Sequence, residues 1–224
     1  MTDAKDLIQP DRGQDAISIH LVNKDGFDDF ARALSAGQRA SLAAQKFDGS
    51  AQQVGIVPDG DGFFVAGGVA NPESLSSWCL AAIAEALPEG TYRLVGERQP
   101  GAAMFGWMTA QYRFTRYREE ENPVGPRVLL STEIARMDAL RAEAEAEMKV
   151  RDLVNTPAED MGPAALEAEC EALAKAHGAQ LSVTRGDTLE QGYPMVHAVG
   201  RAAARHHAPR IMHLTWGDEA DPVL

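Results

Sequence analysis

The stretch RDLVNTPAEDMGP, at residues 151–163, holds the sharpest break in the pattern of this sequence. A residue before proline avoids the α region, so Thr156 followed by Pro157 predicts the end of a helix. Pro163 suits the first turn of another helix, because the backbone N–H that proline lacks is not needed there. We therefore expect one structural unit to end and a second to begin within these residues.

The residues before this break carry the longest helical signal of the chain. Helical spacing relates Ile134, Met137, Arg141, Ala144 and Met148, and the N-cap candidates are Ser131 and Thr132. A helix of roughly 22 residues spans about 33 Å, which is long enough to join two domains. Its acidic run, Glu143, Glu145 and Glu147, is expected to be a solvated face rather than a metal site. Residues two apart on a helix do not face one another, so these carboxylates would not converge on one ion. We predict that residues 131–155 form a connecting helix.

Residues 1–130 alternate between strand and helix signals. Strand-like runs occupy 16–22, 53–57, 63–69, 92–96 and 127–130, and helical signals occupy 27–34, 38–47, 71–87 and 102–114. The turn sequence PDGDG at 58–62 predicts a hairpin. The helix at 71–87 is expected to carry Leu75 and Trp78 on its apolar stripe, and the residues before 16 read as a polar tail. This alternation predicts a layered α/β domain.

Residues 156–224 begin a second α/β pattern. The expected elements are a helix at 163–177, a strand at 180–184, a short helix within 189–201 and a strand at 210–216. The last of these, RIMHLTW, is apolar on both faces, which is typical of a parallel sheet covered by helices. A domain of about 70 residues that stops as another strand begins is expected to be incomplete.

Composition excludes several classes of protein. Apolar residues make up 45% of the 224 residues and the formal net charge is -12. A soluble globular protein is expected, and its negative field opposes nucleic-acid and membrane partners. No signal region or membrane-length apolar run is present, so we expect a cytoplasmic protein. Cys79 and Cys170 lie in helical segments and are expected to be core side chains rather than a disulfide or a nucleophile.

A search for catalytic patterns assigns no residue a catalytic, cofactor-binding or metal-binding role. The six histidines are His20, His177, His197, His206, His207 and His213, and none belongs to an HExxH motif. No serine has the flanking glycines of GxSxG. His206 and His207 are expected to diverge on a surface loop. His213, within an apolar strand, is expected to be a hydrogen-bonded core residue.

Two motifs are weak candidates for binding. Gly67 and Gly68 lie between a strand and a helix, where backbone N–H groups can hold a phosphate, although close packing is the commoner reason for adjacent glycines. Residues 112–118, YRFTRYR, combine arginines with aromatic rings, as single-stranded nucleic-acid sites do. Three glutamates at 119–121 cancel their field. We favour packing for the glycines and local pairing at a helix end for the arginines.

Several segments resemble the leucyl aminopeptidase family. RDLVNTPAEDMGP is similar to the opening of that family's catalytic domain, and GYPMVHAVGRAAA (192–204) and PRIMHLTWG (209–217) resemble segments that follow it. LPEGTYRL (87–94) and GWMTAQYRFTRYR (106–118) resemble its variable N-terminal domain. By this resemblance Asn155, Thr156, Pro157 and Pro163 would shape the domain junction, and Trp216 with Gly217 would end a core strand. The likeness runs through both units in order.

The resemblance implies a fold and an activity. The fold is a macro-like N-terminal α/β domain at 1–130, a connecting helix at 131–155 and the incomplete opening of an α/β peptidase domain at 156–224. The activity is that of a cytoplasmic, homo-hexameric metallopeptidase that removes N-terminal residues, leucine above all, from peptides, using two divalent zinc or manganese ions. The metal-binding and catalytic segments of the family follow the last strand here. We therefore expect this chain to bind no metal and to be inactive alone.

Two other functions stay open at this stage. The chain would act as a non-catalytic binding module if its macro-like domain held a nucleotide-type ligand near Gly67 and Gly68. It would act as a DNA-binding regulator if the N-terminal domain contacted DNA, which the net charge of -12 opposes.

Overall fold

The computed structural model describes residues 4, 7–96, 98–118, 124–218 and 220. The chain forms two compact units, Met1–Val150 and Arg151–Leu224. Within the described residues, no helix is both long and apolar enough to cross a membrane. Each unit is described separately below.

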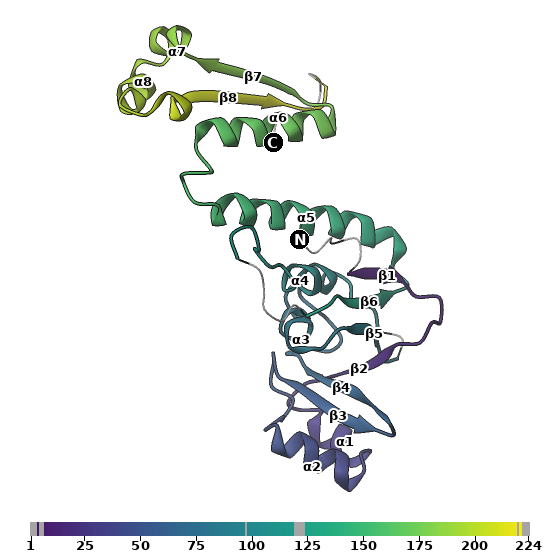
Figure 1. The fold of residues 1–224 in the computed structure, drawn as a ribbon. Helices are drawn as coiled ribbons and strands as arrows, with labels where there is room; N and C mark the ends of the chain where they lie inside the picture. The colour runs from purple at the N-terminus through teal and green to yellow at the C-terminus, as the bar shows by residue number, and fades with distance from the viewer. Residues whose placement is uncertain (1–3, 5–6, 97, 119–123, 219, 221–224) are drawn as a thin grey trace. The chain divides into compact units, whose positions relative to one another are not determined.

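The first unit is built on a mixed six-stranded sheet (Figure 1). The strands, in spatial order, are β1 (Ile8–Pro10), β6 (Arg127–Ser131), β5 (Gly90–Leu94), β2 (Ile17–Val22), β4 (Gly62–Gly68) and β3 (Val54–Asp59). All neighbours pair in parallel except β3 and β4, which form the predicted hairpin with Asp59 opposite Gly62. The predicted α/β fold class is confirmed.

Helices cover both faces of this sheet because successive strand residues point to opposite sides. Ile19, Leu21 and Val65 belong to one apolar cluster, which also takes in residues of α3 (Ala81–Ala86), α4 (Ala103–Thr109) and α5 (Ile134–Asn155). Their neighbours Val22, Phe64 and Ala66 belong to a second cluster, with residues of α1 (Phe27–Arg32) and α2 (Ala36–Ala44). The unit is a layered α/β structure with a core on each face.

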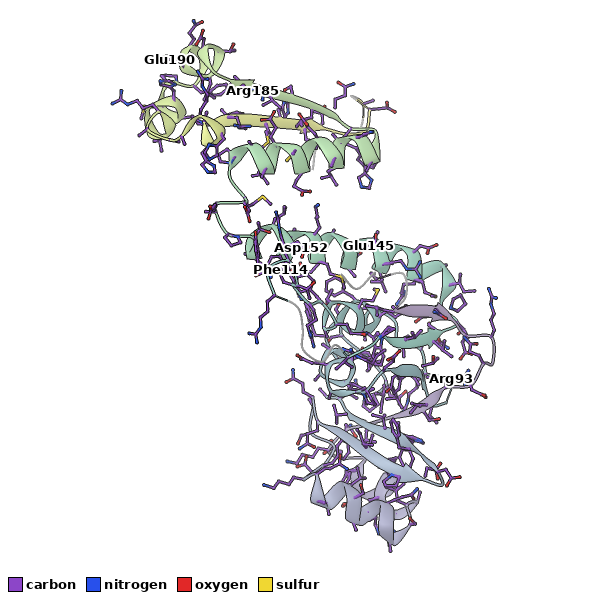
Figure 2. The ribbon with its side chains drawn as sticks, viewed as in Figure 1. Arg93, Phe114, Glu145, Asp152, Arg185 and Glu190 are labelled. Carbon is purple, nitrogen blue, oxygen red and sulfur yellow. The ribbon has the colours of Figure 1, made fainter. Side chains whose placement is uncertain are left out.

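The long predicted helix is present as α5, with 22 residues. It ends at Asn155, before Thr156 and Pro157, as expected. Met137, Leu140, Ala144 and Met148 are its buried residues, and they join the core of the first unit. The predicted stripe was wrong at Ile134, which is 60% exposed, because the buried face runs through Leu140 instead. Glu145 is exposed, as expected for a solvated face (Figure 2).

Three other predictions for this unit need correction. The helix expected at 71–87 is confined to α3, and Trp78 is 50% exposed. The Asn71 side chain accepts a hydrogen bond from the Glu73 backbone N–H at 2.9 Å, which favours a turn over a helix. The helix expected at 102–114 ends at Thr109. The supposed polar tail contains β1, whose Ile8 is 1% exposed.

The second unit contains a two-stranded sheet and several helices. They are α6 (Pro163–His177), β7 (Gln180–Arg185), α7 (Asp187–Gly192), α8 (Pro194–Gly200), a 3₁₀ helix (Arg205–His207) and β8 (Arg210–Thr215). Pro163 lies in the first turn of α6, as predicted, and Gly178 follows the helix in the left-handed conformation. The parallel sheet expected around 210–216 was wrong, because β7 and β8 pair antiparallel. An apolar run does not by itself fix strand direction.

Two predictions for single residues, one in each unit, also need correction. His213 is exposed on β8 rather than buried in a core. Cys79 lies in a turn before α3 rather than in a helix, although it packs against the core of the first unit. Cys170 is half-buried on α6. Both cysteines are free thiols in this structure.

A buried carboxylate joins the three main elements of the second unit. Glu167, on α6, accepts a hydrogen bond from Arg185 of β7 at 3.0 Å and a second from Arg210 of β8. The Glu167 and Arg210 side chains are only 6% and 8% exposed. Figure 2 labels Arg185 on its strand. The carboxylate therefore links the helix to both strands of the two-stranded sheet.

Replacing Glu167 tests this link. We expect Glu167→Ala to destabilise the second unit by about 3 kcal/mol, because it leaves the buried Arg210 cation without its counter-charge. Amide hydrogen exchange of β7 and β8 is the measurement, and faster exchange is expected. Glu171→Ala, at an exposed position of the same helix, is the matched control. Equal exchange rates in the two variants would contradict the role assigned to Glu167.

Candidate functional site

The described part of the first unit carries two neighbouring cavities at one edge of its sheet. The larger, of about 810 Å³, is lined by Pro72, Glu73, Leu75, Val95, Gly96, Arg98 and Gln99. The smaller, of about 350 Å³, is lined by residues 20–23 at the end of β2, by Gly26 and Phe30, and by Asn71, Pro72, Glu73, Val95 and Arg98. Both lie where β2, β4 and β5 end. We call them together the edge pocket.

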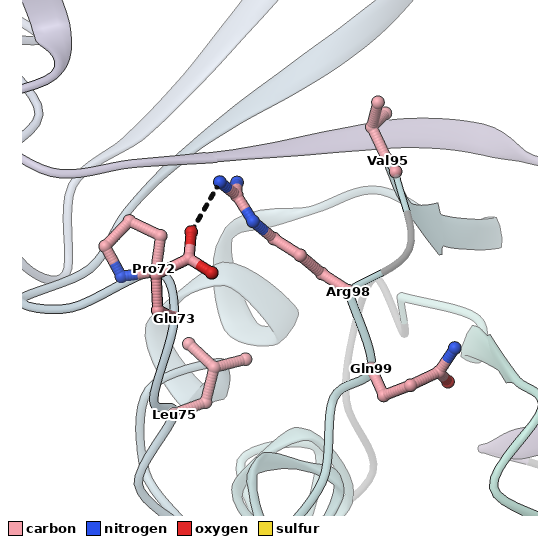
Figure 3. Close-up of a pocket in the computed structure, with 7 residues that line it drawn as sticks. Pro72, Glu73, Leu75, Val95, Arg98 and Gln99 are labelled. Carbon is pink, nitrogen blue, oxygen red and sulfur yellow. Dashed lines mark hydrogen bonds and ion pairs between the residues drawn. The ribbon is translucent and has the colours of Figure 1, made fainter.

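An ion pair lies at the centre of the edge pocket (Figure 3). The Arg98 guanidinium donates to a Glu73 carboxylate oxygen at 2.9 Å and to the Leu21 backbone carbonyl at 3.2 Å. Glu73 follows β4 and Arg98 follows β5, so the pair joins two strand-end loops to strand β2. Both residues line both cavities. No sequence motif contains either residue, which is why the sequence did not reveal this pair.

His20 contributes an aromatic wall to the smaller cavity. Its ring centroid lies 4.9 Å from that of Phe64 and 5.7 Å from that of Phe30. Burial among these rings lowers the pKa of His20 below its usual 6.5, because desolvation disfavours the charged imidazolium. The His20 side chain therefore lies beside the pocket as an aromatic group whose neutral form is favoured by burial.

The glycine motif does not form a ligand cradle. A Cβ atom on Gly67 would lie 2.4 Å from Cδ1 of Ile83, and one on Gly68 would lie 2.0 Å from the Ser50 carbonyl oxygen. Gly68 is required by close packing against backbone, and Gly67 packs closely against the buried Ile83 side chain, as the sequence interpretation favoured. After these glycines, the next residue along the chain that lines the cavity is Asn71.

The basic aromatic segment pairs locally. Arg113 donates to the Ala110 and Tyr112 carbonyl oxygens at 3.1 and 2.9 Å, and lies 4.0 Å from a Glu85 oxygen. Arg116 lies over the Tyr117 ring. The segment follows α4 rather than forming its end, and the glutamates at 119–121 lie outside the described residues. The predicted local pairing is confirmed for Arg113.

Comparison with known proteins identifies the family of this chain. The sequence profile of the M17 aminopeptidase N-terminal domain matches residues 17–130, and that of the cytosol aminopeptidase catalytic domain matches residues 148–223. The chain belongs to the M17 family of cytosol aminopeptidases. The resemblance expected from the sequence is thereby confirmed.

Individual relatives agree with this assignment. A protein named probable cytosol aminopeptidase from Nocardia farcinica is 35% identical over 127 residues, which are 51% of this chain and 25% of that protein. The crystal structure of a cytosol aminopeptidase from Coxiella burnetii matches with a TM-score of 0.77 and 27% identity, over 96% of this chain and 47% of that one. A bottromycin maturation enzyme in complex with Mn shares the fold, with a TM-score of 0.69 and 24% identity, over 92% and 46%. This M17 chain spans about half the length of these related structures.

The described residues of this M17 chain do not fit a two-metal centre. Among them, no group of three or more histidine, cysteine, aspartate or glutamate side chains is placed to hold one ion. The buried carboxylate of Glu167 is bound by two arginines. His206 and His207 were expected to diverge, but their ring centroids are 4.0 Å apart on the 3₁₀ helix. His197 lies 3.6 Å from Glu190. We derive no catalytic step from these groups.

The packing role of Gly68 is testable by substitution. We expect Gly68→Ala to destabilise the first unit by about 2 kcal/mol, because its methyl group meets backbone rather than a flexible side chain. Urea unfolding followed by tryptophan fluorescence measures the change. Gly62→Ala, in the same strand, is the control, since its nearest neighbour is the Asp59 carbonyl oxygen at 3.8 Å. A stability loss no larger than that of the control would contradict the packing assignment.

The lowered pKa of His20 predicts a pH effect on stability. Because the pKa of His20 is lower in the folded than in the unfolded state, His20 contributes stability to the folded state above about pH 6.5. This contribution is lost as the pH falls through the folded-state pKa. We expect a proton NMR titration to give His20 a pKa below 6.5. We also expect His20→Gln to reduce the loss of first-unit stability between pH 7.5 and 5.5. His20 is the one histidine in residues 1–150, so an undiminished loss in the variant would disprove this assignment.

Proposed function

We propose that this chain forms the N-terminal unit and the opening of the catalytic unit of an M17 aminopeptidase that hydrolyses N-terminal residues, leucine above all, from peptides. The observation that carries the proposal is the order of the two family matches, which cover both structural units in sequence. The similarity to the Coxiella burnetii enzyme across 96% of this chain supports the same arrangement. The division into a domain at 1–130, a connector at 131–155 and a domain opening at 156–224 is part of the proposal.

The chemistry belongs to the longer enzyme in this proposal. When bound in the longer enzyme, two divalent ions, manganese or zinc, would lower the pKa of a water molecule and would stabilise charge on the substrate carbonyl. The ligands of those ions are contributed by segments beyond the ones that this chain contains, and the complete enzyme is a cytoplasmic homo-hexamer. By this proposal the 224-residue chain alone binds no metal and hydrolyses no peptide. Its residues shape and support the unit that the catalytic segments complete.

A second candidate function is a non-catalytic, macro-like binding module. The edge pocket favours it, because ligands of open α/β sheets bind outside the carboxyl ends of the strands. The packing of Gly67 and Gly68 opposes the phosphate cradle on which a nucleotide-type ligand would depend. The aminopeptidase proposal rests on matches to both units, whereas this one rests on a single pocket, so we favour the first.

An activity assay with a mass measurement tests the proposal. We expect the purified 224-residue chain to release no product from leucine p-nitroanilide with manganese or zinc present. The protein detected in its native cell by peptides of this region is expected to be about twice the mass of the chain, as for a protein with a second full domain. That longer protein is expected to hydrolyse the substrate and to lose activity with a chelator.

Two results would contradict the proposal. Chelator-sensitive hydrolysis by the 224-residue chain would mean that it carries its own metal site. A native mass of 24.1 kDa without hydrolysis would exclude the aminopeptidase and favour the binding module.

A further inference from the structure

The edge pocket lies where the strand order of the sheet reverses. From β2 the chain proceeds to β3 and β4 on one side, and it then crosses to β5 on the other side of β2. The loops after β4 and β5 therefore leave the sheet at the same edge, on either side of the end of β2. A crevice at such a reversal is the usual place for a ligand in an open α/β sheet. The two cavities, of about 350 and about 810 Å³, fall within the size range of small-molecule sites.

The charges in this pocket are paired and accessible. Arg98 and Glu73 are in contact at 2.9 Å, yet their side chains are 40% and 75% exposed. An ion pair this exposed contributes little to stability, so either partner can accept a new counter-charge at small cost. Among the lining residues that the structure describes, Arg98 is the one arginine or lysine and Glu73 the one carboxylate. The pocket thus offers one positive and one negative group side by side.

Apolar side chains complete the pocket on both sides of the pair. Leu75 and Val95 line the larger cavity, and Phe30 and Val95 line the smaller one. Figure 3 shows Leu75 and Val95 near the Glu73–Arg98 pair. A ligand held by the two charges therefore has room for an aliphatic side chain against apolar walls.

This arrangement selects against nucleotides and other polyanions. The Arg98 cation is already neutralised by Glu73, and a second phosphate would meet that carboxylate. The net charge of -12 adds to the repulsion. A zwitterion avoids the repulsion by Glu73 and by the net negative charge. Its carboxylate can replace Glu73 as the partner of Arg98, and its ammonium group can then pair with the Glu73 carboxylate.

We infer that the edge pocket binds a free α-amino acid with an aliphatic side chain. The ligand's carboxylate binds Arg98, its ammonium group binds Glu73, and its side chain packs against Leu75 and Val95. The choice of leucine as the first probe rests on the proposed function, since an aminopeptidase releases such amino acids. The charge complementarity rests on the pocket alone.

Calorimetric titration of the 224-residue chain with matched ligands tests this inference. L-leucine is expected to bind saturably without metal. N-acetylleucine lacks the ammonium group and leucine amide lacks the carboxylate, so each is expected to bind about tenfold more weakly or worse, as for loss of one charge-assisted hydrogen bond. Equal binding of the three ligands, or no heat from leucine, would overturn the inference. Binding of ADP-ribose in place of leucine would also overturn it and would favour the nucleotide module.

Two variants locate the site, and a third serves as control. Arg98→Gln and Glu73→Gln are each expected to weaken leucine binding about tenfold or more, with circular dichroism unchanged. Arg113→Gln removes another arginine of the first unit, 4.0 Å from Glu85, and is expected to bind leucine normally. Leucine binding that survives both pocket variants would place the ligand elsewhere. The readout needs no hydrolysis, so a failure here leaves the aminopeptidase proposal intact, and the reverse also holds.

Discussion

The alternation of side chains along strand β2 is the constraint on which the first unit depends. Ile19 and Leu21 face one apolar cluster, while Val22 faces the other. A central strand with apolar residues on both faces cannot leave either face in water, so helices must cover both. Parallel pairing with β4 and β5 follows, because crossover connections are what bring helices onto the faces of a sheet.

The same constraint explains the position of the edge pocket. Parallel strands all end at one edge, so the polar residues that follow them gather there without any shared motif. Close packing of Gly68 against Ser50 and of Gly67 against Ile83 fills the space directly at the end of β4. The first open space therefore lies beyond them, where Asn71 turns the chain and presents Glu73 to Arg98.

The sequence predicted what local pattern determines and missed what tertiary contact determines. Strict alternation gave strand β2, and the PDGDG turn gave the β3–β4 hairpin. Strand β1 has three residues, too few for any period, and it exists because it pairs with β6. The direction of β8 depends on its partner β7, and the Glu73–Arg98 pair joins residues 25 apart in sequence. Neither has a local signature, so no reading of periodicity could have found them.

The two units are stabilised by different means, which bears on how each can act. The first has apolar clusters on both faces of its sheet. In the described part of the second, Ala174 and Leu189 are the buried apolar side chains, whereas Val199 is 89% and Trp216 74% exposed. A two-stranded sheet linked to one helix by the Glu167 ion pairs gains directional contacts but little hydrophobic free energy. Local opening is therefore easier in the second unit than in the first. The first unit therefore holds a preformed pocket at the edge of its sheet, whereas the second unit exposes large apolar side chains.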